Sequence, residues 1–142
     1  MVRRGKGKST AILVDSSMSI SSAILLPQLR ALVEEKIGRV NVAKVVLLQE
    51  QAQKYAKEIA HNGFLPVIVH DDLDVHFALE AMELVYNEKI HILVIATENE
   101  KMLPLLVKAQ EIGKEVNLVR ISNASNNGLE NAADHVFRLE IE

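Results

Sequence analysis

The sequence predicts a three-layer α/β/α sandwich with a mainly parallel β-sheet. Two observations carry this prediction. Short runs rich in Val, Ile and Leu alternate with longer stretches whose apolar residues recur every three to four positions, which is the pattern of strands joined by helices. The run at 90–96 is almost continuously apolar, as expected of a strand that helices cover on both faces. Crossovers between parallel strands are right-handed and place helices on both sides of the sheet.

Each expected element follows from its local pattern. The strands are short, apolar and rich in β-branched residues, at 10–15, 42–49, 65–69, 90–96, 116–121 and 136–141. The helices carry apolar residues at helical spacing, at 25–37, 51–62, 75–85, 103–112 and 129–133. Gly38, Gly63 and Gly113 stand just past three of these helices, where glycine commonly ends a helix.

Length and composition predict one domain with a full core. The chain has 142 residues, of which 49% are hydrophobic, so it can bury a core without disulfides or structural metal ions. We expect a basic tail at residues 1–9 and the domain at 10–142. The absence of cysteine excludes disulfides, thiolate metal ligands and a thiol nucleophile. No apolar run approaches the roughly 18 residues that cross a bilayer, and the N-terminus lacks the apolar core of a signal peptide. We therefore expect a cytoplasmic protein with no membrane partner.

The charge of the chain limits how it could bind nucleic acid. The net charge is −3, so binding would depend on local basic patches. The best candidate is the tail, with Arg3, Arg4, Lys6 and Lys8. A basic run at a terminus is more often simply exposed to solvent than part of a binding site.

Polar groups follow several of the predicted strands. Asp15 ends the first, residues 70–74 follow the third, and residues 97–101 follow the fourth. Ligands of parallel α/β sheets bind beyond the carboxyl ends of the strands, so we expect these groups to meet there. Asp15 is either a ligand or catalytic group, or an acceptor for backbone N–H groups of the next turn.

Two of these groups have contrasting explanations. The aspartates at 71 and 72 fit the first turn of a helix, which favours negative charge. Lys101 is a cation placed close to the start of the helix marked by Pro104, where the helix dipole disfavours it. An acid nearby would explain Lys101. Phosphate-binding, dinucleotide-binding and nucleophile-elbow motifs are absent.

Four short segments, in order and at suitable spacing, carry a family resemblance. They are 14–18 (Val-Asp-Ser-Ser-Met), 73–75 (Leu-Asp-Val) with Glu80 as a later acid, 97–105 (Thr-Glu-Asn-Glu-Lys-Met-Leu-Pro-Leu) and 132–134 (Ala-Ala-Asp). Over about residues 11–139 the chain resembles the NYN domain, a branch of the PIN-like nucleases, and especially its small archaeal members.

The resemblance implies metal-dependent cleavage of RNA, with carboxylates holding one or two Mg²⁺ or Mn²⁺ ions. Asp15 and Asp74 match principal family carboxylates, and Glu80 is the third candidate ligand. Asn99 and Lys101 stand where the family has aspartates, and Met18 where it has asparagine. We interpret the acidic site as degenerate and expect no cofactor. We also expect the ammonium of Lys101 to lie within about 4–6 Å of Asp15 or Asp74, where it favours the ionised carboxylate.

Three hypotheses for function follow. The first is a nuclease-fold protein that binds RNA or a protein partner, with catalysis lost or much reduced. The second is an active Mg²⁺- or Mn²⁺-dependent endoribonuclease in which Glu98 or Glu100 replaces the lost aspartates. The third is a flavodoxin-like or receiver-like domain that binds a small molecule or regulates a partner, with its pocket near Asp15. The family analogy and the apolar composition favour a homodimer.

Overall fold

A computed structural model describes residues 8–18, 20, 22–121, 123–125 and 128–140. Its centre is a six-stranded sheet in the order β3-β2-β1-β4-β5-β6. All five strand pairings are parallel. The predicted α/β fold is therefore confirmed. Three residues of the basic tail, Arg3, Arg4 and Lys6, lie outside the described residues, whereas Lys8 is described and exposed.

The elements alternate along the chain as the sequence predicts. The strands are β1 (Thr10–Asp15), β2 (Val40–Leu48), β3 (Leu65–Val69), β4 (Ile92–Ala96), β5 (Glu115–Ile121) and β6 (His135–Leu139). The helices are α1 (Leu25–Lys36), α2 (Gln49–His61), α3 (Leu73–Val85) and α4 (Leu103–Ile112). Two short 3₁₀ helices complete the fold, η1 (Glu100–Met102) and η2 (Leu129–Ala132).

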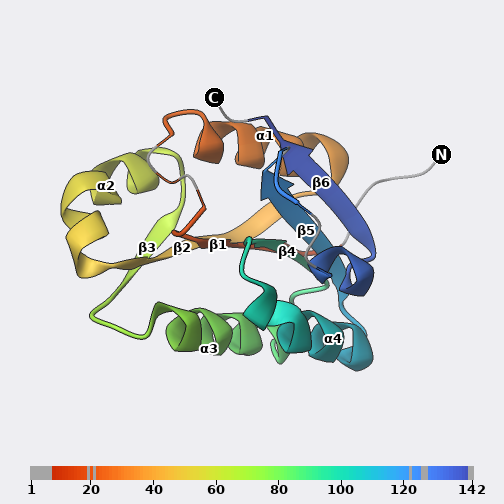
Figure 1. The fold of residues 1–142 in the computed structure, drawn as a ribbon. Coiled ribbons are helices and arrows are strands. Elements are labelled where there is room, and N and C mark those ends of the chain that lie inside the picture. The colour runs from red at the N-terminus through yellow and green to blue at the C-terminus, as the bar shows by residue number, and fades with distance from the viewer. Residues whose placement is uncertain (1–7, 19, 21, 122, 126–127, 141–142) are drawn as a thin grey trace.

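The helices form one layer on each face of the sheet (Figure 1). Side chains of α1 and α2 pack with one set of strand residues, such as Ile12 and Val94. Side chains of α3, α4 and η2 pack with the alternate set, such as Leu13 and Leu93. This division follows from the strand geometry, because successive side chains of a strand point to opposite faces. All six residues of β1 are buried, so the first strand is the middle of both cores.

Some boundaries differ from the predicted ones for local reasons. The fourth strand begins at Ile92 instead of residue 90, because the N–H of Ile90 donates to Asn87 O at 3.1 Å and closes the turn after α3. The second helix begins two residues early, at Gln49, since the side chain of Gln51 accepts the N–H of Leu48 at 3.3 Å. The third helix also begins two residues early, after Asp72 in a left-handed conformation with φ 51°.

The strand order singles out one region of the sheet edge, beyond the carboxyl ends of β1 and β4, which we call the crevice. From β1 the chain builds outward to β2 and β3, and from β4 it builds the other way to β5 and β6. The order of strands therefore reverses between β1 and β4, and ligand sites of open α/β sheets lie at such a reversal, beyond the carboxyl ends of the strands. Asp15 ends β1 and Thr97 follows β4. Among the described residues, none of the helices is both long and apolar enough to cross a membrane.

Candidate functional site

Asp15 is buried at the centre of the crevice, with 1% of its surface exposed. Its Oδ1 accepts the N–H of Ser17 at 3.0 Å, and its Oδ2 accepts the hydroxyl of Thr97 at 3.0 Å. The bond to Ser17 is the local turn bond that aspartate commonly makes two residues along the chain. The bond to Thr97 joins the ends of β1 and β4. Both oxygens of Asp15 therefore already have a donor within the protein.

The loop after β4 is shaped by hydrogen bonds between side chains and the backbone N–H groups two residues further along the chain. The Thr97 hydroxyl accepts the N–H of Asn99 at 3.0 Å, and Asn99 Oδ1 accepts the N–H of Lys101 at 3.0 Å. Asn99 thus caps η1, which Asx residues do well at the start of a helix. The side chain of Asn99 contributes this hydrogen bond and no charge.

Lys101 pairs with Asp74 at the start of α3. Lys101 Nζ lies 3.8 Å from Asp74 Oδ2, and the two side chains are 78% and 45% exposed. The expected proximity of Lys101 to one of the retained carboxylates is confirmed, with Asp74 as the partner. Together with Asp72, Leu73 and Val75 they border an open hollow of about 510 Å³. A pair this exposed contributes at most about 1 kcal/mol to stability. What matters for function is that Lys101 places a positive charge in this hollow.

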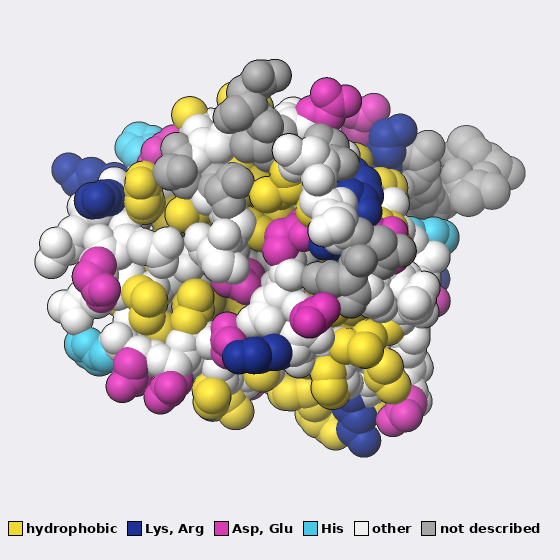
Figure 2. Space-filling view, in the orientation of Figure 1, with side chains coloured by type: hydrophobic (Ala, Val, Ile, Leu, Met, Phe, Trp, Pro, Cys, Tyr) yellow, Lys and Arg dark blue, Asp and Glu magenta, His cyan; other side chains and the backbone are white. Residues whose placement is uncertain are grey.

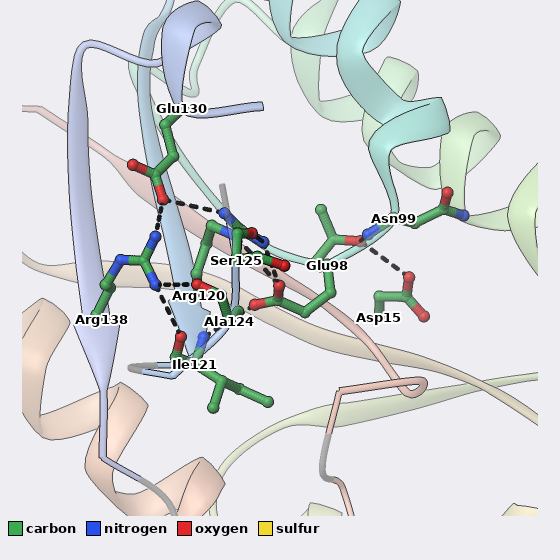
Figure 3. A network of polar contacts seen from close by, with 10 residues as sticks. Asp15, Glu98, Asn99, Arg120, Ile121, Ala124, Ser125, Glu130 and Arg138 are labelled. Atoms are coloured by element: carbon green, nitrogen blue, oxygen red, sulfur yellow. Dashed lines mark hydrogen bonds and ion pairs between the residues drawn. The ribbon is translucent and has the colours of Figure 1, made fainter. Parts of the chain in front are cut away.

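Glu98 faces away from Asp15 toward a buried arginine on β5 (Figure 3). Its Oε1 accepts bonds from Arg120 Nη2 at 2.5 Å and from Nε at 3.1 Å, and its Oε2 accepts the N–H of Ile121 at 2.9 Å. The side chain of Arg120 is 2% exposed. Glu98 is therefore the counter-ion of Arg120 and is not placed to act as a shifted metal ligand.

The same arginine extends into a larger ionic network (Figure 3). Arg120 Nη1 donates to Glu130 Oε2 at 3.0 Å, and Nη2 donates to the carbonyl of Ser125 at 2.8 Å. Glu130 also pairs with Arg138 on β6, whose guanidinium donates to the carbonyl of Ala124 at 2.7 Å. The network ties the loop after β4 to β5, η2 and β6.

The pKa values of two of these groups reflect the pairing. Burial opposes the charged form of Arg120, but its hydrogen bonds to Glu98 and Glu130 outweigh this and raise the pKa of the guanidinium. Loss of hydration alone would raise the pKa of Glu130. The hydrogen bonds from Arg120 and Arg138 outweigh that effect and lower the pKa. Both groups are thus held in their charged forms.

The remaining candidate acids do not join Asp15 and Asp74. Glu80 lies on α3 and accepts a bond from Lys44 of β2 at 3.0 Å, so in this arrangement its partner is a lysine. Glu100 is exposed in η1. Nowhere in the described part of the chain do three or more His, Asp or Glu side chains gather as a metal site.

The donor set around the crevice therefore does not fit a divalent ion. Mg²⁺ and Mn²⁺ need several oxygen ligands, and carboxylates near the ion supply most of the charge that binds it. Asp15 keeps lone pairs beside its bonds to Ser17 and Thr97, but Asp74 has an ammonium beside it and Glu98 is bound to Arg120. The positions that the family fills with aspartate supply a capping amide and a cation.

Two other resembling segments have structural roles. Met18 is fully buried and packs in the core beneath α1 and α2. Asp134 stands at the opposite edge of the sheet, where its Oδ2 accepts the N–H of Val116 at 2.7 Å and its own N–H donates to Val116 O at 2.8 Å. Neither side chain belongs to the crevice.

Sequence reasoning missed Arg120 and Glu130. The only local signal was an arginine at 120 that directly follows the apolar residues of a predicted strand. In the structure the strand residues at 116, 118 and 119 are fully buried. A charge there needs a buried partner, but its partners lie 22 and 10 residues away in the chain. The distance along the chain hides the pairing.

The comparisons with known proteins agree with the fold and the resembling segments. The NYN domain model matches residues 9–140, and the chain belongs to this family, a branch of the PIN-like nucleases. It is 31% identical over 140 residues to the uncharacterized protein MJ0482 of Methanocaldococcus jannaschii. That match covers 96% of this chain but 58% of the relative, so the chain spans little more than half of the relative's length.

A solved structure shares the fold at low sequence identity. The crystal structure of VPA0982, a protein of unknown function from Vibrio parahaemolyticus, superposes with a TM-score of 0.71 and 14% identity. The match covers 98% of this chain and 97% of that one. The likeness establishes the architecture and carries no statement about activity.

Proposed function

We propose that this NYN-domain chain binds RNA at the carboxyl edge of its sheet and has lost most or all of the family's metal-dependent cleavage. One observation carries the proposal. The ammonium of Lys101 lies 3.8 Å from Asp74, at a position where the family resemblance calls for an aspartate. The lysine supplies in the protein itself a positive charge that active relatives would take from a metal ion.

Lys101 is the cation that would contact a phosphate at this edge without a metal, in a hollow that Asp72 and Asp74 also border. The side chain of Lys101 is 78% exposed, so its ammonium can contact a phosphodiester as well as Asp74. Lysine binds phosphate as a point charge with three donors. Asp15, which would repel a phosphate, is 1% exposed and holds two donors.

The test combines a binding and a cleavage measurement on the full chain. A fluorescein-labelled single-stranded RNA is titrated with and without EDTA, and the same RNA is incubated with millimolar Mn²⁺. We expect binding that EDTA leaves unchanged and no cleavage. Lys101→Met should weaken binding and lower the salt slope by about 0.7, the share of one phosphate contact on a single strand.

The matched control is Lys108→Met, which removes an exposed lysine of α4 away from the crevice. It should leave both the affinity and the slope near the wild-type values. Robust cleavage in Mn²⁺ that Asp15→Asn abolishes would contradict the proposal. That result would establish the endoribonuclease, with Asp15 as one of its essential carboxylates.

A second candidate function, binding a protein partner, is favoured by an apolar surface. Val75 and Leu79 of α3 and Leu103 and Val107 of α4 are each 37–58% exposed, and α3 and α4 are neighbours. Hydrophobic side chains lie over both helices at the bottom of Figure 2. We name these four residues the α3/α4 face. Contiguous apolar surface of this kind marks interaction sites.

We propose a second copy of the chain as the partner, which makes the protein a homodimer. Light scattering after size exclusion should give twice the mass of one chain, and Leu79→Glu should give a monomer because the charge would be buried at the interface. Gln53→Glu, an exposed change on α2, is the control. A monomeric wild type at every concentration would contradict the homodimer.

A further inference from the structure

We propose that the pocket between the turn after β1 and the first half of α2 binds one nucleotide of single-stranded RNA, with Tyr55 stacking on the base and Lys54 contacting the phosphate. The inference rests on the proposed RNA-binding function and locates a subsite for it. The pocket holds about 400 Å³, within the roughly 300–1,000 Å³ of small-ligand sites. Its walls come from two segments: Ser16, Ser17 and Ile20, and Gln51, Lys54 and Tyr55.

The pocket adjoins Asp15 on the face of the sheet away from Lys101. Ser16 and Ser17 follow Asp15 directly, and the N–H of Ser17 is bound to its carboxylate at 3.0 Å. Tyr55 packs with the core of α1 and α2, whereas Asp74 and Lys101 belong to the α3 and α4 side. A strand of RNA that runs across the carboxyl edge from Lys101 to Tyr55 would therefore pass the end of β1.

The pocket is built by hydrogen bonds within the protein. Gln51 Oε1 accepts the hydroxyl of Ser16 at 2.8 Å and the N–H of Leu48 at 3.3 Å. Gln51 Nε2 donates to the carbonyl of Ser16 at 3.4 Å. The two bonds to Ser16 hold the turn after β1 against the start of α2, and the bond to Leu48 fixes Gln51 itself, so this part of the wall is formed without a ligand. A site formed in advance binds at a lower entropic cost.

The side chains of the pocket match the parts of a nucleotide. Tyr55 is half-buried and offers an aromatic surface, on which any base can stack. Lys54 is exposed and has no ion-pair partner within 4.0 Å in the described part of the chain. Its ammonium is available to a phosphate.

Glu50 also borders the pocket and determines the orientation of the ligand. Its carboxylate repels phosphate and accepts hydrogen bonds, so it faces the base or the ribose. The 2′-hydroxyl of RNA is a donor that DNA lacks. We therefore expect the pocket to favour RNA over DNA of the same sequence.

The experiment compares two pocket variants with two matched controls by anisotropy with a labelled single-stranded RNA. Tyr55→Leu keeps apolar bulk against the core and removes the ring, and Tyr86→Leu removes an exposed ring at the end of α3. Lys54→Ala is matched by Lys57→Ala, an exposed lysine of the same helix outside the pocket. Thermal melts of all four variants verify that each is folded.

The expected losses differ in kind. Tyr55→Leu should weaken binding about tenfold, since a base–aromatic stack is of that order. Lys54→Ala should lower the salt slope by about 0.7, a change that a purely structural role would not produce. Tyr86→Leu and Lys57→Ala should bind as the wild type does.

The outcomes separate the pocket from the proposed function. A wild type that binds RNA, with Tyr55→Leu as tight as Tyr86→Leu and an unchanged slope for Lys54→Ala, overturns the pocket and leaves the proposed function intact. A wild type that does not bind RNA overturns both. Equal affinity for RNA and DNA would contradict the assigned orientation at Glu50.

Discussion

The double substitution Asn99→Asp and Lys101→Asp is expected to strengthen Mn²⁺ binding at the crevice. It shifts the local charge by three units, one at residue 99 and two at residue 101. One unit charge about 6 Å from a divalent ion changes its energy by roughly 1.4 kcal/mol even in water, or about tenfold in affinity. The expected gain is therefore on the order of a thousandfold, measured by calorimetric titration with Mn²⁺.

The fold should survive this change. Asn99 caps η1 through its Oδ1, and aspartate caps a helix about as well as asparagine. The pair of Lys101 with Asp74 is exposed, so its loss costs at most about 1 kcal/mol. The control, Asn131→Asp with Lys108→Asp, alters the net charge equally at exposed positions of η2 and α4. Equal Mn²⁺ affinity in both double variants would show that the carboxylates do not converge.

Replacement of Arg120 by methionine is expected to destabilise the fold by about 3 kcal/mol. It removes the guanidinium that pairs with Glu98 and one of the two arginines that pair with Glu130. Glu98 and Glu130 are 25% and 21% exposed. The expected loss of stability therefore lies at the lower end of the range for buried ion pairs that lose one partner. Urea unfolding at neutral pH measures it. Arg39→Met, at an exposed arginine, should cost less than 0.5 kcal/mol, as surface changes usually do.

Acid should narrow the difference between the wild type and Arg120→Met. The pKa of Glu130 is lowered from its usual value of 4.5 by its two arginines. Such a group stabilises the folded state above its unfolded pKa, and this contribution is lost as the pH falls through the lower folded value. The difference in urea midpoint between the wild type and Arg120→Met should thus be largest at neutral pH and shrink below about pH 4.5.

Adding Glu98→Gln and Glu130→Gln to Arg120→Met should restore part of the stability at neutral pH. A triple variant as unstable as Arg120→Met would contradict the ionic explanation.

The fold and the convergence at the sheet edge could be predicted because both follow from local patterns. Alternation of strands and helices requires parallel pairing, and parallel pairing brings the carboxyl ends of β1 and β4 together. That reasoning was enough to place Asp15 beside the loop at 97–101, where the bond to Thr97 joins them. Lys101 was predictable as well, because a cation near a helix start needs an acid.

The partners of individual side chains were less predictable. Glu98 and Asn99 are adjacent in the chain, yet one faces Arg120 and the other caps η1. Successive loop residues diverge in this way, and spacing alone does not assign their directions. Glu80 follows Asp74 by six residues, so the two leave α3 in different directions, and Lys44 of β2 engages Glu80. The partner of a helix side chain depends on which strand packs beneath the helix. Tertiary packing determines that strand, and local sequence patterns do not reveal it.

The central place of β1 determines how the protein can fold during synthesis. β1 needs β2 on one side and β4 on the other, and Val14 pairs with Ala96 across 82 residues of chain. A nascent chain that ends after β3 has therefore made only half of the pairings of its central strand and exposes an apolar edge on the ribosome. Unpaired edges of this kind are prone to aggregation. The later half, with β5 and β6, can add in order once β4 has docked, so we expect the pairing of β4 with β1 to be the slow step of folding.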